Sequence, residues 1–151
     1  MTLNTTRRFA RRLTHVALAT ALAATGLPLA WAGTVSGPLA QAVAKGKDIF
    51  AHDTFGGGRG MTCQSCHTAG GTTAGTTPSG AKIPSLSNAA AIFPRYAHGQ
   101  LVTLEDQVRR CVAGALGGKP PAYDSQQMRD LVAYMTSLSQ GKPINMGGKP
   151  Q

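Results

Sequence analysis

The sequence predicts an all-α domain of three to four short helices joined by long loops. Three segments place apolar residues at helical spacing, and no segment shows the alternation of a strand. The chain of 151 residues holds 19 Gly and 9 Pro, which indicates extended irregular connections. Three short helices bury little apolar surface by themselves, so we expect another body to complete the core.

The first predicted helix begins near Pro38 and gathers its apolar residues on one face. Gly46 lies on that face, where it weakens the helix, so we expect another helix to pack closely there. The other residues of the face are Leu39, Ala42, Val43, Ile49 and Phe50.

The second predicted helix starts after Thr103, a suitable N-cap because Asp106 follows three residues later. It ends at Gly117, where two glycines are followed by two prolines. Its apolar face consists of Leu104, Val108, Cys111, Val112 and Ala115.

The third predicted helix has Asp124 as its expected N-cap and ends before Gly141 and Pro143. Residues 68–99, between the first two helices, are rich in Gly, Thr, Ser, Pro and Ala, so we expect a loop there. The buried face of the third helix consists of Met128, Leu131, Val132, Met135 and Leu138.

Residues 1–32 have the organisation of a secretory signal peptide. Four Arg residues precede a run of mostly Ala and Leu, and residues 30–32 (Ala-Trp-Ala) offer a small-x-small cleavage site. The alternative is a membrane anchor, but the apolar run is shorter than the ~20 residues that a spanning helix needs. We therefore expect a periplasmic domain over 33–143 and a flexible tail over 144–151, with no stable membrane anchor after cleavage.

Export changes the charge balance of the chain. Cleavage removes four Arg and no acidic residue, which leaves eleven basic and six acidic side chains and a net charge of +5. This moderate charge suits an acidic protein partner or a small anion and gives little support to nucleic-acid binding. All three Cys remain in an oxidising compartment, so their odd number needs an explanation.

Residues 63–67 (Cys-Gln-Ser-Cys-His) match the motif of c-type haem attachment. The thiols of Cys63 and Cys66 would add to the haem vinyl groups, and His67 would take the proximal iron position. We expect the Pro84 carbonyl to accept a hydrogen bond from the N–H of this imidazole, unless Pro84 is only a turn residue. The alternatives to haem are a redox dithiol and a zinc half-site, but a zinc site needs a second Cys or His pair. We predict one covalently attached haem c per chain, which also completes the core.

Cys111 is the favoured distal iron ligand. It follows His67 by 44 residues, enough chain to pass around the haem edge, and it lies on the inward face of the second helix. It is the thiol that haem attachment leaves unpaired, and coordination to ferric iron would stabilise its thiolate. An inert core thiol and an intermolecular disulfide remain as alternatives for Cys111. Met146 in the tail and His98 in a loop are less favoured distal ligands.

Further motifs accompany the attachment site: Gly70-Gly71, Phe93-Pro94-Arg95-Tyr96, Val102-Thr103-Leu104-Glu105, Cys111, Gly118-Lys119-Pro120, Asp124-Ser125, Met128, Ala133-Tyr134, Leu138-Ser139, Gly141 and Pro143. With them, the mature chain resembles a class I cytochrome c over about residues 45–143. More narrowly, it is similar to the haem domain of bacterial thiosulfate dehydrogenases and related sulfur-oxidation cytochromes with His/Cys-ligated haem. The resemblance implies the class I cytochrome c fold around one haem. It also implies a distal Cys111 that takes part in oxidising thiosulfate-type sulfur.

The chain departs from this family at several positions near Cys111. The enzymes usually have an Arg where this chain has Gln107 and a Ser where it has Ala115. The related sulfur-oxidation cytochromes favour an Arg where Val112 stands, and the enzymes generally own a second haem domain. Arg109 or Arg110 could replace the missing charge, although acidic residues four positions earlier favour a solvated face.

We therefore predict a periplasmic monohaem cytochrome that acts in electron transfer, as a carrier or as the haem subunit of a redox system linked to sulfur-compound oxidation. Its expected partners are a periplasmic redox protein with an acidic docking face and a small sulfur anion. The first alternative is a thiosulfate oxidoreductase in which Cys111 is catalytic. The second is a haem-based binder of small ligands, in which a weak distal ligand moves aside.

Overall fold

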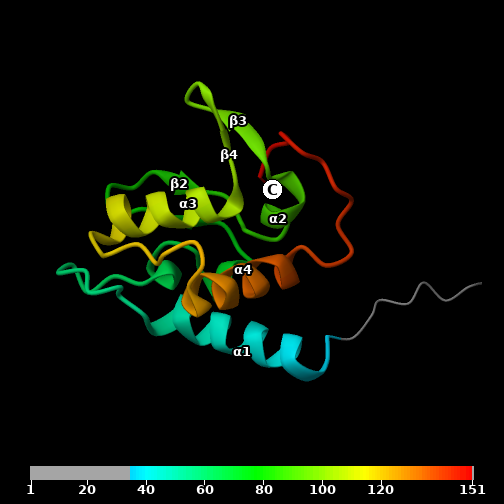
Figure 1. Ribbon diagram of the computed structural model, residues 1–151. Helices are drawn as coiled ribbons and strands as arrows, with labels where there is room; N and C mark the ends of the chain where they lie inside the picture. The colour runs from blue at the N-terminus through cyan, green and yellow to red at the C-terminus, as the bar shows by residue number, and fades with distance from the viewer. Residues whose placement is uncertain (1–34, 151) are drawn as a thin grey trace, which may run out of the picture. The chain divides into compact units, whose positions relative to one another are not determined.

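The computed structural model describes residues 35–150, and the predicted signal peptide lies outside them (Figure 1). Over this range the chain is mostly helical, as predicted, and no helix in it is long and apolar enough to cross a membrane. The largest fully buried side chains belong to Phe50, Ile92, Val102, Val112, Met128 and Leu131.

Four α-helices, three shorter turns and two small hairpins make up the described chain. The strands have two or three residues each, too few to show an alternating pattern, so the sequence did not predict them. The loop expected over 68–99 holds three of these strands and also the four-residue helix at 89–92, which helical spacing did not reveal. The helices and turns are α1 (Gly37–His52), η1 (Cys63–Ser65), η2 (Ala69–Gly71), α2 (Ala89–Ile92), α3 (Leu104–Cys111), the π-helical turn η3 (Val112–Leu116) and α4 (Gln126–Leu138). The antiparallel strand pairs are β1 (Gly75–Thr76) with β2 (Lys82–Ile83), and β3 (Arg95–Ala97) with β4 (Gln100–Val102).

Helices α1 and α4 lie side by side (Figure 1). Gly46 makes this close approach possible, because a Cβ at this position would overlap the backbone carbonyl of Asp130 and the Cβ of Tyr134. The Phe50 ring packs edge-on against Tyr134, with 5.4 Å between the ring centroids. The close helix packing expected at Gly46 is confirmed.

Helix α3 begins and ends as the sequence predicts. The Thr103 hydroxyl accepts a hydrogen bond from the Asp106 amide (3.2 Å), and the Asp106 carboxylate accepts one from the Thr103 amide (2.9 Å). The helix continues through η3 and stops at Gly117, whose φ of 67° is left-handed.

The N-cap of α4 differs from the prediction by one residue. Ser125, not Asp124, is the cap, because its hydroxyl accepts a hydrogen bond from the Met128 amide at 3.1 Å. Asp124 lies one residue farther out, where its backbone carbonyl accepts a hydrogen bond from Arg129. The expected cap was therefore wrong, although the helix itself was predicted.

The segment after α4 lies along α2. The amides of Asn145 and Gly147 donate hydrogen bonds to the carbonyl oxygens of Ala91 (2.7 Å) and Ile92 (2.9 Å). Figure 1 shows this segment, in red, returning to α2. These bonds use backbone atoms alone, so they leave no trace in the residue types of the segment. The flexibility expected of residues 144–151 stays a prediction.

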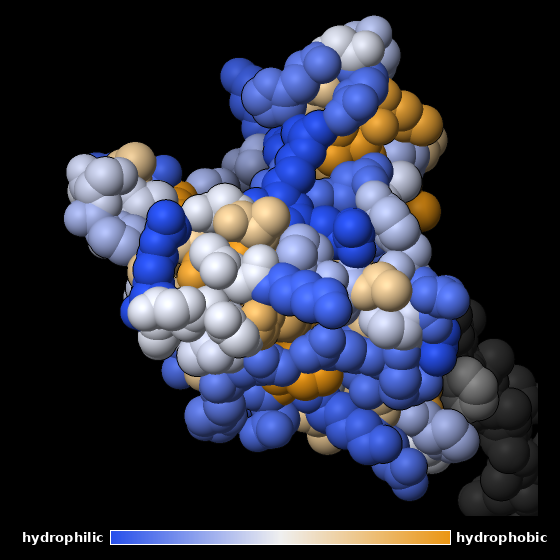
Figure 2. Space-filling view, turned by 60° about the vertical axis from the view of Figure 1, so that its left-hand side comes forward, coloured by the Kyte–Doolittle hydropathy of each residue, from blue (hydrophilic) through white to orange (hydrophobic). Residues whose placement is uncertain are grey.

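The β3–β4 hairpin stands out from the helices (Figure 1). Tyr96 and Leu101 face each other across its two strands and are 75% and 65% exposed. Val102, at the base, is only 1% exposed and anchors the hairpin in the core. Figure 2 shows a face that is mostly hydrophilic, with hydrophobic side chains in separate patches.

Candidate functional site

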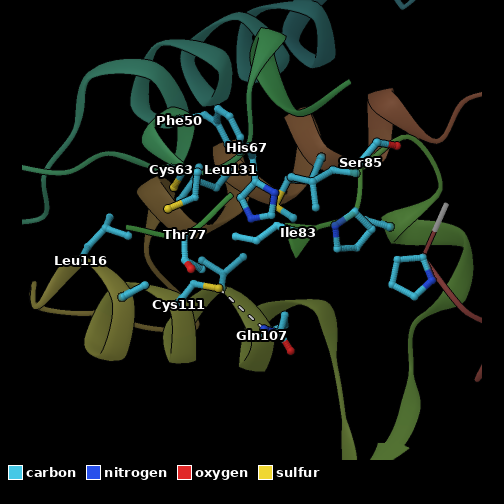
Figure 3. Close-up of a pocket in the computed structure, with 18 of the residues that line it drawn as sticks. Phe50, Cys63, His67, Thr77, Ile83, Ser85, Gln107, Cys111, Leu116 and Leu131 are labelled. Carbon is cyan, nitrogen blue, oxygen red and sulfur yellow. Dashed lines mark hydrogen bonds between the residues drawn. The ribbon is translucent and has the colours of Figure 1, made fainter. Parts of the chain in front are cut away.

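A cavity of about 1010 Å³ lies between the attachment motif and α3, and its wall is mostly apolar (Figure 3). Its volume is at the upper end of the range for ligand and cofactor sites, roughly 300–1,000 Å³. The structure brings together at this cavity the predicted site residues Cys63, Cys66, His67, Pro84 and Cys111.

The attachment motif forms a tight turn at the cavity wall. The Thr62 amide donates to the Ser65 hydroxyl (2.9 Å), and the His67 amide donates to the Cys63 carbonyl (3.0 Å). Burial, followed by the charge of Cys111, raises the pKa of the Cys63 thiol to about 12. A redox-active dithiol needs a lowered pKa, so the buried environment of Cys63 does not favour dithiol chemistry.

His67 follows the turn and presents its imidazole to the cavity (Figure 3). Burial lowers its pKa, and the Pro84 carbonyl offsets only part of this shift, so the ring is neutral at pH 7, the form that binds metals. Its Nδ1 is buried and makes no hydrogen bond of good geometry within the described chain. The Pro84 carbonyl lies close enough to the ring to raise its pKa, and the predicted hydrogen bond stays a prediction. The Phe50 ring lies 6.3 Å from the imidazole, centroid to centroid.

Cys111 is the last residue of α3 and points from that helix toward the space that His67 faces (Figure 3). Its side chain is half-buried, and its Sγ accepts a hydrogen bond from Nε2 of Gln107 at 3.6 Å. Burial raises the pKa of the thiol above its usual value, and the Gln107 hydrogen bond offsets only part of this rise. A thiol and an imidazole from separate elements therefore face one cavity.

The two less favoured ligands lie elsewhere. His98 is exposed at the tip of the β3–β4 hairpin with a left-handed φ of 52°, and Met146 is 67% exposed. Neither side chain lines the cavity. Two other methionines do line it: Met135, which is 7% exposed, and Met61, which packs against the buried core.

Arg95 and Gln107 are cavity residues whose connection the sequence did not reveal. Nη2 of Arg95 donates to Oε1 of Gln107 at 3.3 Å, and the guanidinium carbon lies 4.9 Å from the centroid of the Phe93 ring. Nε of Arg95 is buried and has no partner among the described residues. The two residues are twelve positions apart on different elements, so their spacing carries no signal.

These residues fit a covalently held haem. Two thiols and an imidazole stand on one turn, and the apolar wall suits the faces of a macrocycle. Arg95 adds a buried donor without a partner, which suits an anionic group such as a haem propionate. The two thiols, the imidazole and the apolar cavity wall are thus all suited to a covalently attached haem.

Residues 45–144 match the family model of the SoxA/TsdA cytochrome c domain. The chain belongs to this family. It is a class I c-type cytochrome with covalently attached haem c, as the sequence predicted.

Thiosulfate dehydrogenases are among its relatives in the SoxA/TsdA family. The chain is 35% identical over 89 residues to the enzyme of Allochromatium vinosum and 29% identical over 91 residues to that of Psychrobacter arcticus. These stretches cover 58% and 59% of this chain but only 32% and 26% of the enzymes. The chain therefore matches about a third or less of the length of these relatives.

Two solved structures, a thiosulfate dehydrogenase and SoxXA, share the fold of this chain. The thiosulfate dehydrogenase (TsdBA) from Marichromatium purpuratum superposes with a TM-score of 0.58 at 20% identity, over 78% of this chain and 28% of that one. SoxXA from P. pantotrophus gives a TM-score of 0.57 at 26% identity, over 73% of this chain and 37% of that one. The predicted class I cytochrome c fold is confirmed.

Proposed function

We propose that this chain is an exported monohaem cytochrome that transfers electrons during the oxidation of sulfur compounds, with His67 and Cys111 as iron ligands. The observation that carries the proposal is the thiol of α3 facing the same apolar cavity as the imidazole of the attachment motif (Figure 3). Haem c supplies an iron that takes up and releases one electron. Cys63 and Cys66 would hold the group, and the mostly apolar wall would limit its contact with water.

A periplasmic redox protein with an acidic face is the proposed partner. The support is the net charge of +5 that remains after cleavage at residue 32, since a basic surface attracts an acidic one. The similarity to thiosulfate dehydrogenases supports a sulfur compound as the source of the electrons. Rapid electron exchange that slows as salt is added would support this partner.

The ligand assignment is tested on the purified ferric holoprotein by low-temperature EPR and visible–near-infrared spectra. We expect a low-spin thiolate signature in the wild type. Cys111→Ala should keep its covalent haem and lose that signature, because the haem is attached elsewhere. Met135→Leu, which alters another sulfur at the same cavity, is the matched control and should retain the wild-type spectrum. A methionine-type charge-transfer band in the wild type would contradict the assignment.

A thiosulfate oxidoreductase is the second candidate. The cavity thiol beside the donors Gln107 and Arg95 favours it, as does the similarity to thiosulfate dehydrogenases. The departures at Gln107, Ala115 and Val112 favour the electron carrier. In the enzymatic case, two thiosulfate ions would join into tetrathionate while two ferric chains each take up one electron. Ferric protein that stays oxidised in excess thiosulfate would exclude this candidate.

A further inference from the structure

We propose that Arg95 and Gln107 form a positioning pair that directs one N–H donor at the Cys111 sulfur and thereby sets the reduction potential of the haem iron. This inference rests on the proposed ligation by Cys111. Neither residue is assigned to bind the iron or a substrate. The effect proposed here acts through Cys111 and is separate from the haem propionate contact that the buried Nε of Arg95 suits.

Gln107 lies on α3, about one helical turn before Cys111. It precedes Cys111 by four residues, which places the two side chains on the same face of the helix, one above the other. Its Nε2 lies 3.6 Å from Sγ of Cys111, within reach of the larger sulfur acceptor. Both residues line the cavity, so this contact lies where an iron ligand would bind.

Arg95 decides which end of the Gln107 amide faces the sulfur. An amide carries an oxygen acceptor and a nitrogen donor, and either could point either way. A guanidinium has donors only, and its Nη2 lies 3.3 Å from the amide oxygen. The oxygen is therefore committed to Arg95, and the NH₂ group is left for Cys111. The pair delivers a donor to the sulfur in one fixed orientation.

The fold holds Arg95 in place for this task. Arg95 pairs with Val102 at the base of the β3–β4 hairpin, and Val102 is 1% exposed. The guanidinium also lies over the Phe93 ring. Only Thr103 separates Val102 from the first residue of α3, so the hairpin base and the helix are joined directly. Arg95 and Gln107 therefore keep their spacing.

A donor on a ligating sulfur has a predictable effect on the iron. A thiolate gives electron density to ferric iron and so stabilises the oxidised state. A hydrogen bond to the sulfur withdraws part of that density and raises the reduction potential. Removing the donor should therefore make the haem harder to reduce.

The test is the reduction potential of purified holoprotein variants at one pH. In Gln107→Leu the donor is lost, and we expect the equilibrium constant for reduction to fall about tenfold, which is about 59 mV for one electron. Gln107→Glu keeps an oxygen for Arg95 and has no donor for the sulfur at neutral pH, so its potential should also fall. Arg95→Leu releases the amide and should lower the potential by less. Gln100→Leu, the same change at an exposed position of β4, should leave the potential unchanged.

The outcomes separate this inference from the ligand assignment. If wild-type and Cys111→Ala proteins give the same ferric EPR spectrum, the ligation and the positioning pair both fail. If the wild type shows thiolate ligation but both Gln107 variants keep its potential, only the positioning pair is wrong. A Gln107→Leu protein that is merely less stable, at unchanged potential, would show that Gln107 is a packing residue. Should Gln107→Leu not mature, Gln107→Ala decides the question, because it removes the donor and adds no charge, whereas the carboxylate of Gln107→Glu lowers the potential by its charge alone.

Discussion

On one side of the cavity, the attachment thiols and the imidazole lie within residues 63–67, and side chains of α1 and α4 line the cavity beside them. We call this the attachment side. On the other side, Cys111 and Gln107 come from α3 and Arg95 comes from the β3–β4 hairpin; we name this the α3 side. The attachment side is specified by consecutive residues and by helix packing. The α3 side depends on side chains that meet only after the chain has folded.

We therefore expect the attachment side to determine which cofactor binds, and the α3 side to determine the spectrum and the reduction potential of that cofactor. A five-residue motif indicates covalent haem, and its residues are consecutive in the chain. The contacts around the Cys111 sulfur can change by single substitutions. The positions at which this chain departs from the family resemblance, Gln107, Val112 and Ala115, lie on the same helical segment as Cys111, in α3 and η3. We expect changes on the attachment side to alter haem content and stability, and changes on the α3 side to alter spectrum and potential.

The largest expected effect comes from removing both attachment thiols. Cys63→Ala combined with Cys66→Ala should abolish covalent haem, because no other cysteine stands beside His67 in the motif. Haem staining of the denatured protein measures this directly. Cys111→Ala is the counterpart on the α3 side and should retain full covalent haem. Equal haem loss in both proteins would remove the distinction between the two sides.

The next effect compares two helical glycines, one on each side. Gly46→Ala should destabilise the holoprotein by about 2 kcal/mol, because the added Cβ would overlap the Asp130 carbonyl and the packed helices would have to shift. Gly114→Ala, in η3, meets nothing within 4 Å and should stabilise by up to about 1 kcal/mol, since Ala favours helix over Gly. Thermal unfolding of both variants, compared with the wild type, shows whether each substitution raises or lowers the stability. Stabilisation by Gly46→Ala would mean that α1 and α4 are not closely packed in solution.

Sequence reasoning succeeded where the determining residues are close together in the chain. The attachment motif and the start of α3 at Thr103 each depend on residues at most four positions apart. Helical spacing also predicted the burial of Met128, Leu131 and Met135 in α4. It missed the buried Tyr134, and the predicted Val132 and Leu138 are only half-buried. The position of Cys111 at the cavity follows from the same helical spacing. Its role as ligand stays a proposal.

Sequence reasoning failed where contacts join distant residues or use only backbone atoms. The hydrogen bond between Arg95 and Gln107 forms because the base of the β3–β4 hairpin leads directly into α3. The residue types alone do not predict this arrangement. The segment after α4 is tied to α2 through main-chain groups such as the Asn145 amide. At Ser125 the error was local, because Asp124 and Ser125 are both good caps and backbone geometry chose between them.

The smallest expected effect lies at the start of α3, far along the helix from Cys111. The Thr103 amide, and next the Tyr123 hydroxyl at 2.6 Å, donate hydrogen bonds to Asp106 and hold its pKa below the usual value. A lowered pKa means that the carboxylate adds stability above its unfolded pKa of about 3.9 and loses that contribution as the pH falls through the folded pKa. Asp106→Asn should therefore unfold at a slightly lower temperature than wild type at pH 7.

Measuring the same two proteins across pH isolates the charge of Asp106. The difference in unfolding temperature should shrink below about pH 4, because protonation makes the wild-type side chain neutral like Asn. The ferric spectrum should not change at pH 7, since Cys111 lies at the other end of α3. A difference that persists unchanged at low pH would assign the effect to shape and not to charge. A changed spectrum would show that the cap and the distal ligand move together, which would make α3 one rigid unit up to its last residue.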